Sequence, residues 1–75
     1  MDATETALAI IARIARRPVA ELTPGMELVA DLDLDSARAL ELLVALEDAL
    51  GIEISDEDAA RLDTVGDILA YLGRL

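Results

Sequence analysis

The spacing of apolar residues predicts a helix at the start of the chain. Apolar side chains recur three and four positions apart there, and we predict a helix from Ala3 to Arg16. Asp2 can cap it, with Glu5 three residues later as in a capping box, and Pro18 disfavours helix beyond that point. The buried stripe of this helix comprises Ala7, Leu8, Ile10, Ile11, Ile14 and Ala15.

A second helix is predicted from Asp35-Ser36 to Leu50-Gly51, where Gly51 suits a helix stop. At about 100° per residue, one arc of roughly 100° collects a core-facing stripe. That stripe comprises Ala39, Leu42, Leu43, Leu46 and Leu50. Further apolar residues lie outside it on the side of Ser36, with acidic residues beside them: Ala37, Leu40 and Val44, then Glu41, Glu47 and Asp48. Either a second element covers this extra apolar face, or a partner does.

Two shorter helices are predicted in the C-terminal third. Ser55 can cap a short helix from Asp56 to Arg61, and Thr64, with Asp67 three residues later, begins a helix through Leu72. The stretch from Pro18 to Asp35 is a long connection, whose expected anchors are Leu22, Leu28 and Leu32. The predicted fold is all-α: a single domain over residues 1–75, built as a bundle of three principal helices and one short helix.

Composition limits the chemistry available to this chain. It has no cysteine and no histidine, so we expect no disulfide and no transition-metal site. Tyr71 is the only aromatic residue, so the core must be aliphatic. No apolar run approaches the roughly 20 residues of a membrane span, and the acidic N-terminus is unlike a signal peptide. We therefore expect a cytoplasmic protein, and a monomer.

The formal charge of −10 is concentrated in the second half of the chain. Residues 27–67 carry thirteen acids against only Arg38 and Arg61. Phosphate repulsion argues against nucleic-acid binding, and the charge favours partners with basic surfaces. The alternative is that the charge only keeps an apolar-rich domain soluble.

The acidic segment before the second helix could in principle bind a calcium ion or supply a catalytic serine. Asp31-x-Asp33-x-Asp35 begins like an EF-hand loop, but the sixth position is Ser36 rather than Gly and the twelfth is Leu42 rather than Glu. A catalytic Ser36 would need a base, and the chain has neither histidine nor lysine. No catalytic residue and no metal ligand is therefore predicted. Ser36 instead offers a hydroxyl at the positive end of a helix, suited to a phosphate ester made by another enzyme.

The motif Asp31-Leu32-Asp33-Leu34-Asp35-Ser36 and the leucine-rich helix after it resemble an acyl carrier protein. The later segments Gly51-Ile52-Glu53-Ile54-Ser55-Asp56-Glu57-Asp58, Leu62-Asp63-Thr64-Val65 and Ile68-x-x-Tyr71-Leu72 also match that family's pattern. The similarity runs in register from about Leu28 to Leu72. It is most specific at Asp35-Ser36.

The resemblance implies a four-helix acyl-carrier-protein fold and a specific cofactor. A phosphopantetheinyl transferase would attach 4'-phosphopantetheine from coenzyme A to Ser36, with Asp35 helping to hold the transferase's magnesium ion. The arm would carry acyl groups as thioesters between the enzymes of fatty-acid or polyketide-type biosynthesis, and the chain itself would not be an enzyme. Acyl-transferring, condensing and modifying enzymes with basic docking patches would meet Leu40, Glu41, Val44, Glu47 and Asp48.

Ala37 and Arg38 depart from the family's pattern, which has a bulky apolar residue and often an acid there. Both alter the first turn of the partner-facing helix and indicate a dedicated carrier rather than the general fatty-acid carrier. Two alternatives stay open: a peptidyl or aminoacyl carrier of a secondary-metabolite pathway, and a helical interaction domain without a cofactor.

Overall fold

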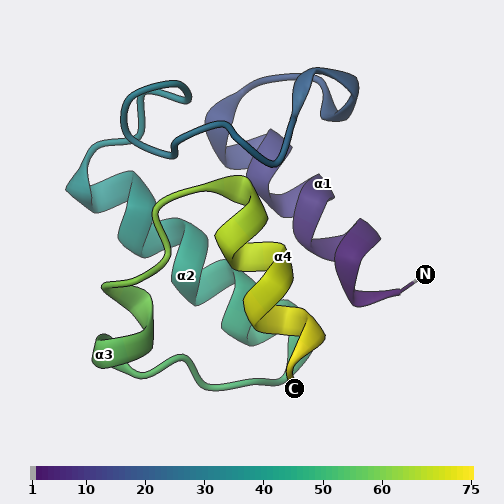
Figure 1. Ribbon diagram of the computed structural model, residues 1–75, viewed down its shortest axis with the longest axis vertical. Helices are drawn as coiled ribbons and strands as arrows, with labels where there is room; N and C mark the ends of the chain where they lie inside the picture. Colours follow the sequence, from purple (N-terminus) through teal and green to yellow (C-terminus); the bar gives the residue numbers. More distant parts are fainter. Residues whose placement is uncertain (1) are drawn as a thin grey trace.

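The computed structural model describes residues 2–75 and contains four α-helices (Figure 1). They are α1 (Ala3–Ala15), α2 (Ser36–Leu50), α3 (Asp56–Ala59) and α4 (Val65–Gly73). Over the same residues no strand forms beyond an isolated bridge between Glu27 and Thr64. The predicted all-α fold of three principal helices and one short helix is confirmed.

Each helix follows a capping side chain; Asp2, Ser55 and Thr64 are caps that the sequence predicts, and Asp35 is one that it did not. The side chains of Asp2, Asp35, Ser55 and Thr64 each accept a hydrogen bond from the backbone N–H three residues later. These bonds satisfy N–H groups that have no partner within the helix. Gly51 ends α2 in the left-handed conformation, with φ of 66°, as expected of a glycine stop. Arg16, which the sequence placed inside the first helix, instead ends it with φ of 59°.

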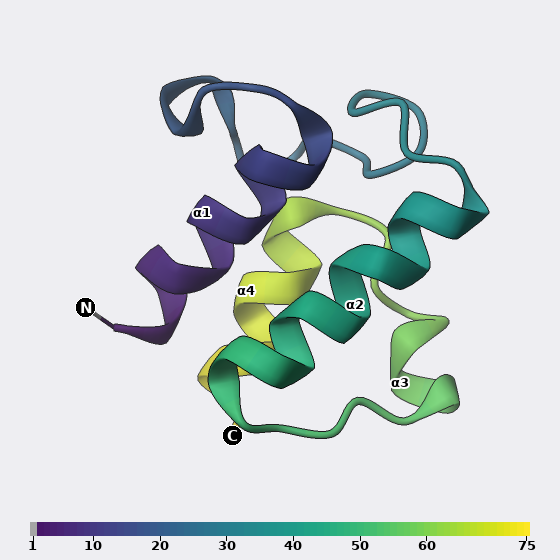
Figure 2. The same cartoon turned by 180° about the vertical axis from the view of Figure 1, so that it is seen from behind.

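The core forms where α1 packs against α2 and α4, while α3 lies at the side of the bundle away from α1 (Figures 1 and 2). Its buried residues come from all three long helices and the long connection: Ala7, Ile10, Ile11, Ile14, Leu28, Leu32, Leu34, Leu42, Leu46, Val65, Ile68 and Leu72. On α2 only Leu42 and Leu46 are fully buried, and the predicted stripe members Ala39, Leu43 and Leu50 are half-buried. The fully buried face of α2 is therefore narrower than the periodicity predicted.

The long connection between α1 and α2 is tied to the start of α4. Leu28 N–H donates to the Asp63 carbonyl at 2.9 Å, and Val65 N–H donates to the Met26 carbonyl at 3.0 Å. Gly66 is required at this crossing, since a Cβ there would lie 2.9 Å from the Pro24 oxygen. The connection also contains a 3₁₀ turn, Val19–Glu21, that the sequence did not predict. These contacts fix the segment that leads into Ser36.

The capping box at α4 makes the stability of the fold sensitive to acid. Asp67 Oδ2 accepts hydrogen bonds from the backbone N–H groups of Asp63 at 3.0 Å and Thr64 at 3.1 Å. These bonds favour the carboxylate and lower the pKa of Asp67 from its ordinary value of 3.8. Because the folded pKa is the lower one, the stabilisation is present above about pH 3.8 and is lost as the pH falls through the folded pKa.

We expect Asp67→Asn to lower the free energy of unfolding at pH 7 and to have a smaller effect at pH 3. Urea denaturation of both proteins at each pH measures this difference. Glu53→Gln is the matched control, because Glu53 is exposed and its substitution removes one acid without removing a cap. An equal effect of Asp67→Asn at both pH values would contradict a role for the charged carboxylate.

Candidate functional site

Ser36 is the first residue of α2, and its side chain is exposed. The Asp35 carboxylate caps the helix through Oδ1, which accepts the Arg38 N–H at 2.8 Å. The N–H groups of Ser36 and Ala37, at the first two helical positions, have no acceptor one turn earlier within the helix. A phosphate ester on Ser36 would thus meet free N–H groups and the positive end of a 15-residue helix.

In the turn before Ser36, residues alternate between buried and exposed positions. Leu32 and Leu34 are 2% and 1% exposed, whereas Asp31, Asp33 and Asp35 face solvent. Asp33 adopts a left-handed conformation with φ of 59°, which aspartate tolerates better than most residues. The buried leucines therefore anchor the turn and hold the Asp35-Ser36 pair at the surface.

Two carboxylates of the acidic turn accept hydrogen bonds from the backbone. Asp31 Oδ2 accepts the Glu27 N–H at 2.8 Å, and Asp35 Oδ1 is used by its cap. From Asp2 to Leu75, no group of three acidic side chains is placed to hold a metal ion together. The carboxylates of this turn instead hold the backbone in place.

The extra apolar face of α2 is left uncovered by the fold. Leu40 is 63% exposed and Val44 is 47% exposed. Exposed acids lie beside them at Glu41 and Asp48, and Ala37 is exposed in the first turn. Of the two readings left open by the sequence, the fold thus leaves this face available to a partner, on the same side of α2 as Ser36.

Two residues predicted on the partner face are only half-exposed. Glu47 Oε2 accepts the Ile54 N–H at 2.8 Å and so ties α2 to the segment before α3. The Arg38 side chain turns toward the end of α1, where it lines a pocket with Arg13 and Arg16. Glu47 therefore has a structural role that the sequence did not reveal, and replacing it would disturb this connection as well as any docking.

Val29 is an exposed apolar residue that the sequence reasoning missed. Its side chain is 67% exposed in the connection before α2, next to the buried Leu28. It lines a hollow of about 210 Å³ together with Ala39 and Leu62. The sequence pattern offered a signal, since Leu28-Val29 is an apolar pair in a loop that can bury only one of them.

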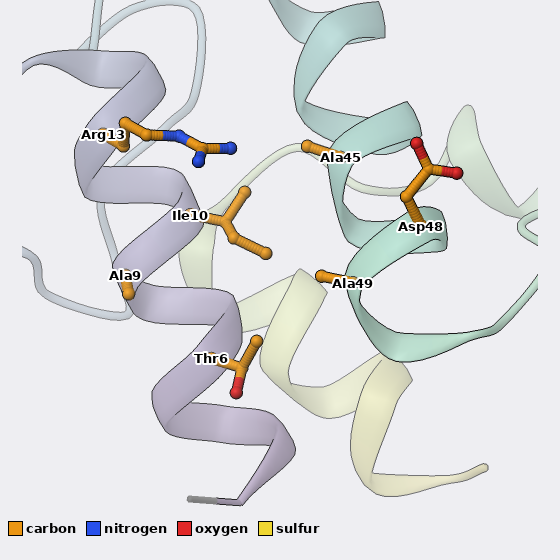
Figure 3. Close-up of a pocket in the computed structure, with 7 residues that line it drawn as sticks. All are labelled: Thr6, Ala9, Ile10, Arg13, Ala45, Asp48 and Ala49. Atoms are coloured by element: carbon orange, nitrogen blue, oxygen red, sulfur yellow. The ribbon is translucent and has the colours of Figure 1, made fainter.

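A larger groove of about 600 Å³ runs between α1 and α2 (Figure 3). Ile10 of α1 faces Ala45 and Ala49 of α2 across it, and Arg13 extends from α1 toward α2. At 100° per residue, Ala45 and Ala49 lie roughly 180° and 220° around α2 from Ser36. This groove is therefore on the opposite side of α2 from Ser36 and about 14–20 Å from it along the helix axis, so we do not assign it to the candidate site.

Comparison with known protein families identifies the family to which this chain belongs. Residues 5–72 match the family described as "Phosphopantetheine attachment site". The chain belongs to the acyl carrier protein family. Acyl carrier proteins of this family carry covalently attached 4'-phosphopantetheine, so the predicted cofactor is confirmed at the level of the family.

Relatives of known name agree with this membership. The meromycolate extension acyl carrier proteins of Mycobacterium tuberculosis and Mycolicibacterium aurum are each 44% identical to this chain over 66 residues, or 88% of its length. The chain spans 57% of the length of the first protein and 68% of the second. These proteins support an acyl carrier role for the matching domain.

The fold agrees with that of a solved acyl carrier protein. A structure assigned as an acyl carrier protein from Mycobacterium tuberculosis superposes with a TM-score of 0.87 at 36% identity, and the match covers 96% of both chains. None of the helices formed by residues 2–75 is long and apolar enough to cross a membrane.

Proposed function

We propose that Ser36 carries the 4'-phosphopantetheine arm and that this acyl carrier protein shuttles acyl thioesters between biosynthetic enzymes. The observation that carries the proposal is the exposed Ser36 hydroxyl at the start of α2, beside an apolar surface that the fold leaves open. The arm's thiol supplies the thioester chemistry, and the chain supplies the attachment point and the docking surface.

Attachment would be catalysed by a phosphopantetheinyl transferase. The Ser36 oxygen attacks the phosphorus that bears the pantetheine of coenzyme A, the pyrophosphate P–O bond breaks, and adenosine 3',5'-bisphosphate leaves. The serine proton passes to a base of the transferase. Among residues 2–75, Asp35 Oδ2 accepts no hydrogen bond, so it can face the transferase's magnesium ion while Oδ1 keeps the helix cap.

Partner enzymes would dock on the surface around the arm. Leu40 and Val44 offer apolar contact area, and Glu41 and Asp48 offer charges for basic side chains. Such charges at the rim of an interface act mainly on the rate of encounter and on specificity. Ala37 is exposed, so a small residue lies next to the arm where the family's pattern has a bulky one.

We propose an acyl cargo of the fatty-acid or polyketide type. The named relatives are acyl carrier proteins of meromycolate extension, which favours an acyl chain over an aminoacyl unit. Loading by cell extract, followed by mass spectrometry of the thioester, distinguishes an acyl from an aminoacyl or peptidyl carrier.

The direct test is incubation with coenzyme A and a promiscuous phosphopantetheinyl transferase. We expect the intact mass to rise by one phosphopantetheine, and peptide mapping to place it on Ser36. Ser55 is the only other serine, and its hydroxyl accepts the Asp58 N–H at 3.1 Å as the cap of α3. An unchanged mass would favour a cofactor-free interaction domain, and modification at Ser55 would refute the assignment of the site.

A further inference from the structure

Three of the chain's six arginines meet where α1 ends and α2 begins. Arg13, Arg16 and Arg38 line a pocket of about 240 Å³ together with Ile14 and Glu41. The pocket is thus lined by three arginines and one glutamate, in a protein whose formal charge is −10. The lining of this pocket is therefore net positive on a negatively charged protein. Its Arg38 lies close in sequence to Ser36, the proposed attachment site.

None of these three arginines forms an ion pair with a carboxylate of residues 2–75. Within residues 2–75, the one ion pair joins Arg61 to Glu57, both on the exposed surface. The chain has sixteen acidic residues with which its arginines could pair. Without such pairing, positive charges held close together repel each other. An anion from outside the folded domain would relieve this repulsion.

We propose that this arginine pocket binds the free carboxylate of an acyl group carried on the arm of Ser36. The inference rests on the proposed function and adds the class of cargo: acyl groups that end in a second carboxylate. The pocket residues Arg13, Arg16 and Arg38 would hold the carboxylate, and Ile14 would contact the methylene groups next to it.

The chemistry of the pocket fits a carboxylate held by a tether. Guanidinium groups match a carboxylate with paired N–H donors, and the net charge of the pocket suits a small anion. A free anion in solution meets the repulsion of a strongly negative protein and the screening of salt. A group on a short flexible arm has an effective concentration in the millimolar range, so a weak site is filled.

The pocket is within reach of the arm. Arg38 is two residues after Ser36, so it lies about 3 Å along the helix axis and roughly 160° around α2, on the opposite side of the helix. Extended phosphopantetheine is longer than the roughly 10 Å diameter of a helix, so the arm can pass around the first turn. Ala37 in that turn is exposed and small, and leaves this path open.

Succinyl and butyryl groups are the probes, because they have the same chain length and differ in the terminal carboxylate. The transferase loads each from its coenzyme A thioester, and thermal unfolding of the two proteins is compared. A carboxylate at an effective concentration of about five times its dissociation constant raises the midpoint by roughly 4–8 °C in a domain of this size. We expect the succinyl form to melt higher than the butyryl form by this amount.

Three variants locate the effect. Arg38→Gln and Arg16→Asn each remove a guanidinium from the pocket, and asparagine tolerates the positive φ of residue 16. Arg74→Gln is the control, since it removes one exposed positive charge elsewhere. We expect the succinyl–butyryl difference to vanish in the two pocket variants and to persist in the control. The Nε–Hε NMR signals of Arg16 and Arg38 should shift in the unsubstituted succinyl protein, while the Arg74 signal stays in place.

The possible outcomes distinguish a failure of the arginine pocket from a failure of the proposed function on which it rests. Equal midpoints for both cargoes, with unmoved arginine signals, would overturn the pocket even though the arm is attached. A carboxylate effect that is the same in all three variants would also overturn it, because a general charge effect would then explain the data. An unchanged mass after loading would overturn the proposed function, and this inference with it.

Discussion

Ser36→Ala is expected to abolish uptake of the phosphopantetheine arm completely, because no other serine has a free hydroxyl in a matching position. The Ser36 side chain is exposed and makes no hydrogen bond within residues 2–75, so its removal should change the free energy of unfolding by less than about 0.5 kcal/mol. Intact mass after incubation with coenzyme A and a transferase measures uptake, and urea denaturation measures folding.

Two further variants show whether the loss comes from the hydroxyl alone. Ser55→Ala should load normally, although it weakens the cap of the short α3. Asp35→Asn keeps a good capping side chain but loses the charge, so it should slow loading while the helix remains intact. Full loading of Ser36→Ala would place the arm on another residue and refute the proposed site.

Leu46→Ala should lower the free energy of unfolding by about 2–5 kcal/mol, which is a large share of the stability of so small a domain. Leu46 is 0% exposed and lies in the core, and its truncation leaves a cavity that the surrounding helices can only partly fill. Urea denaturation with fluorescence of Tyr71, or with circular dichroism, measures the change.

Leu40→Ala is the matched substitution on the exposed face of the same helix, about 120° around α2 from Leu46. Leu40 is 63% exposed, so this variant should fold with nearly unchanged stability. It should instead weaken binding to a partner enzyme by roughly 1–3 kcal/mol, the value expected for burial of a leucine side chain. If Leu40→Ala unfolded the chain as severely as Leu46→Ala, the proposed docking face would belong to the core.

The helix ends were predictable because they depend on neighbours in sequence. Capping side chains and the first N–H groups of a helix lie within three residues of each other, so Ser55 and Thr64 could be assigned before any packing was known. The proposed attachment site was predictable for the same reason. Asp35 and Ser36 are adjacent, and the helix that follows them supplies the electrostatic setting.

The amino-acid sequence by itself thus determined the four helices, three of their four caps and the serine at the start of α2. The tertiary structure decided which apolar residues of α2 are buried: Leu42 and Leu46 are buried, Leu43 is half-buried and Leu40 is exposed. It also decided the contacts between distant segments, such as Glu47 with Ile54 and the meeting of Arg16 with Arg38. Periodicity describes one helix at a time, whereas these contacts depend on how the helices and loops cross, so they follow only from the packed fold.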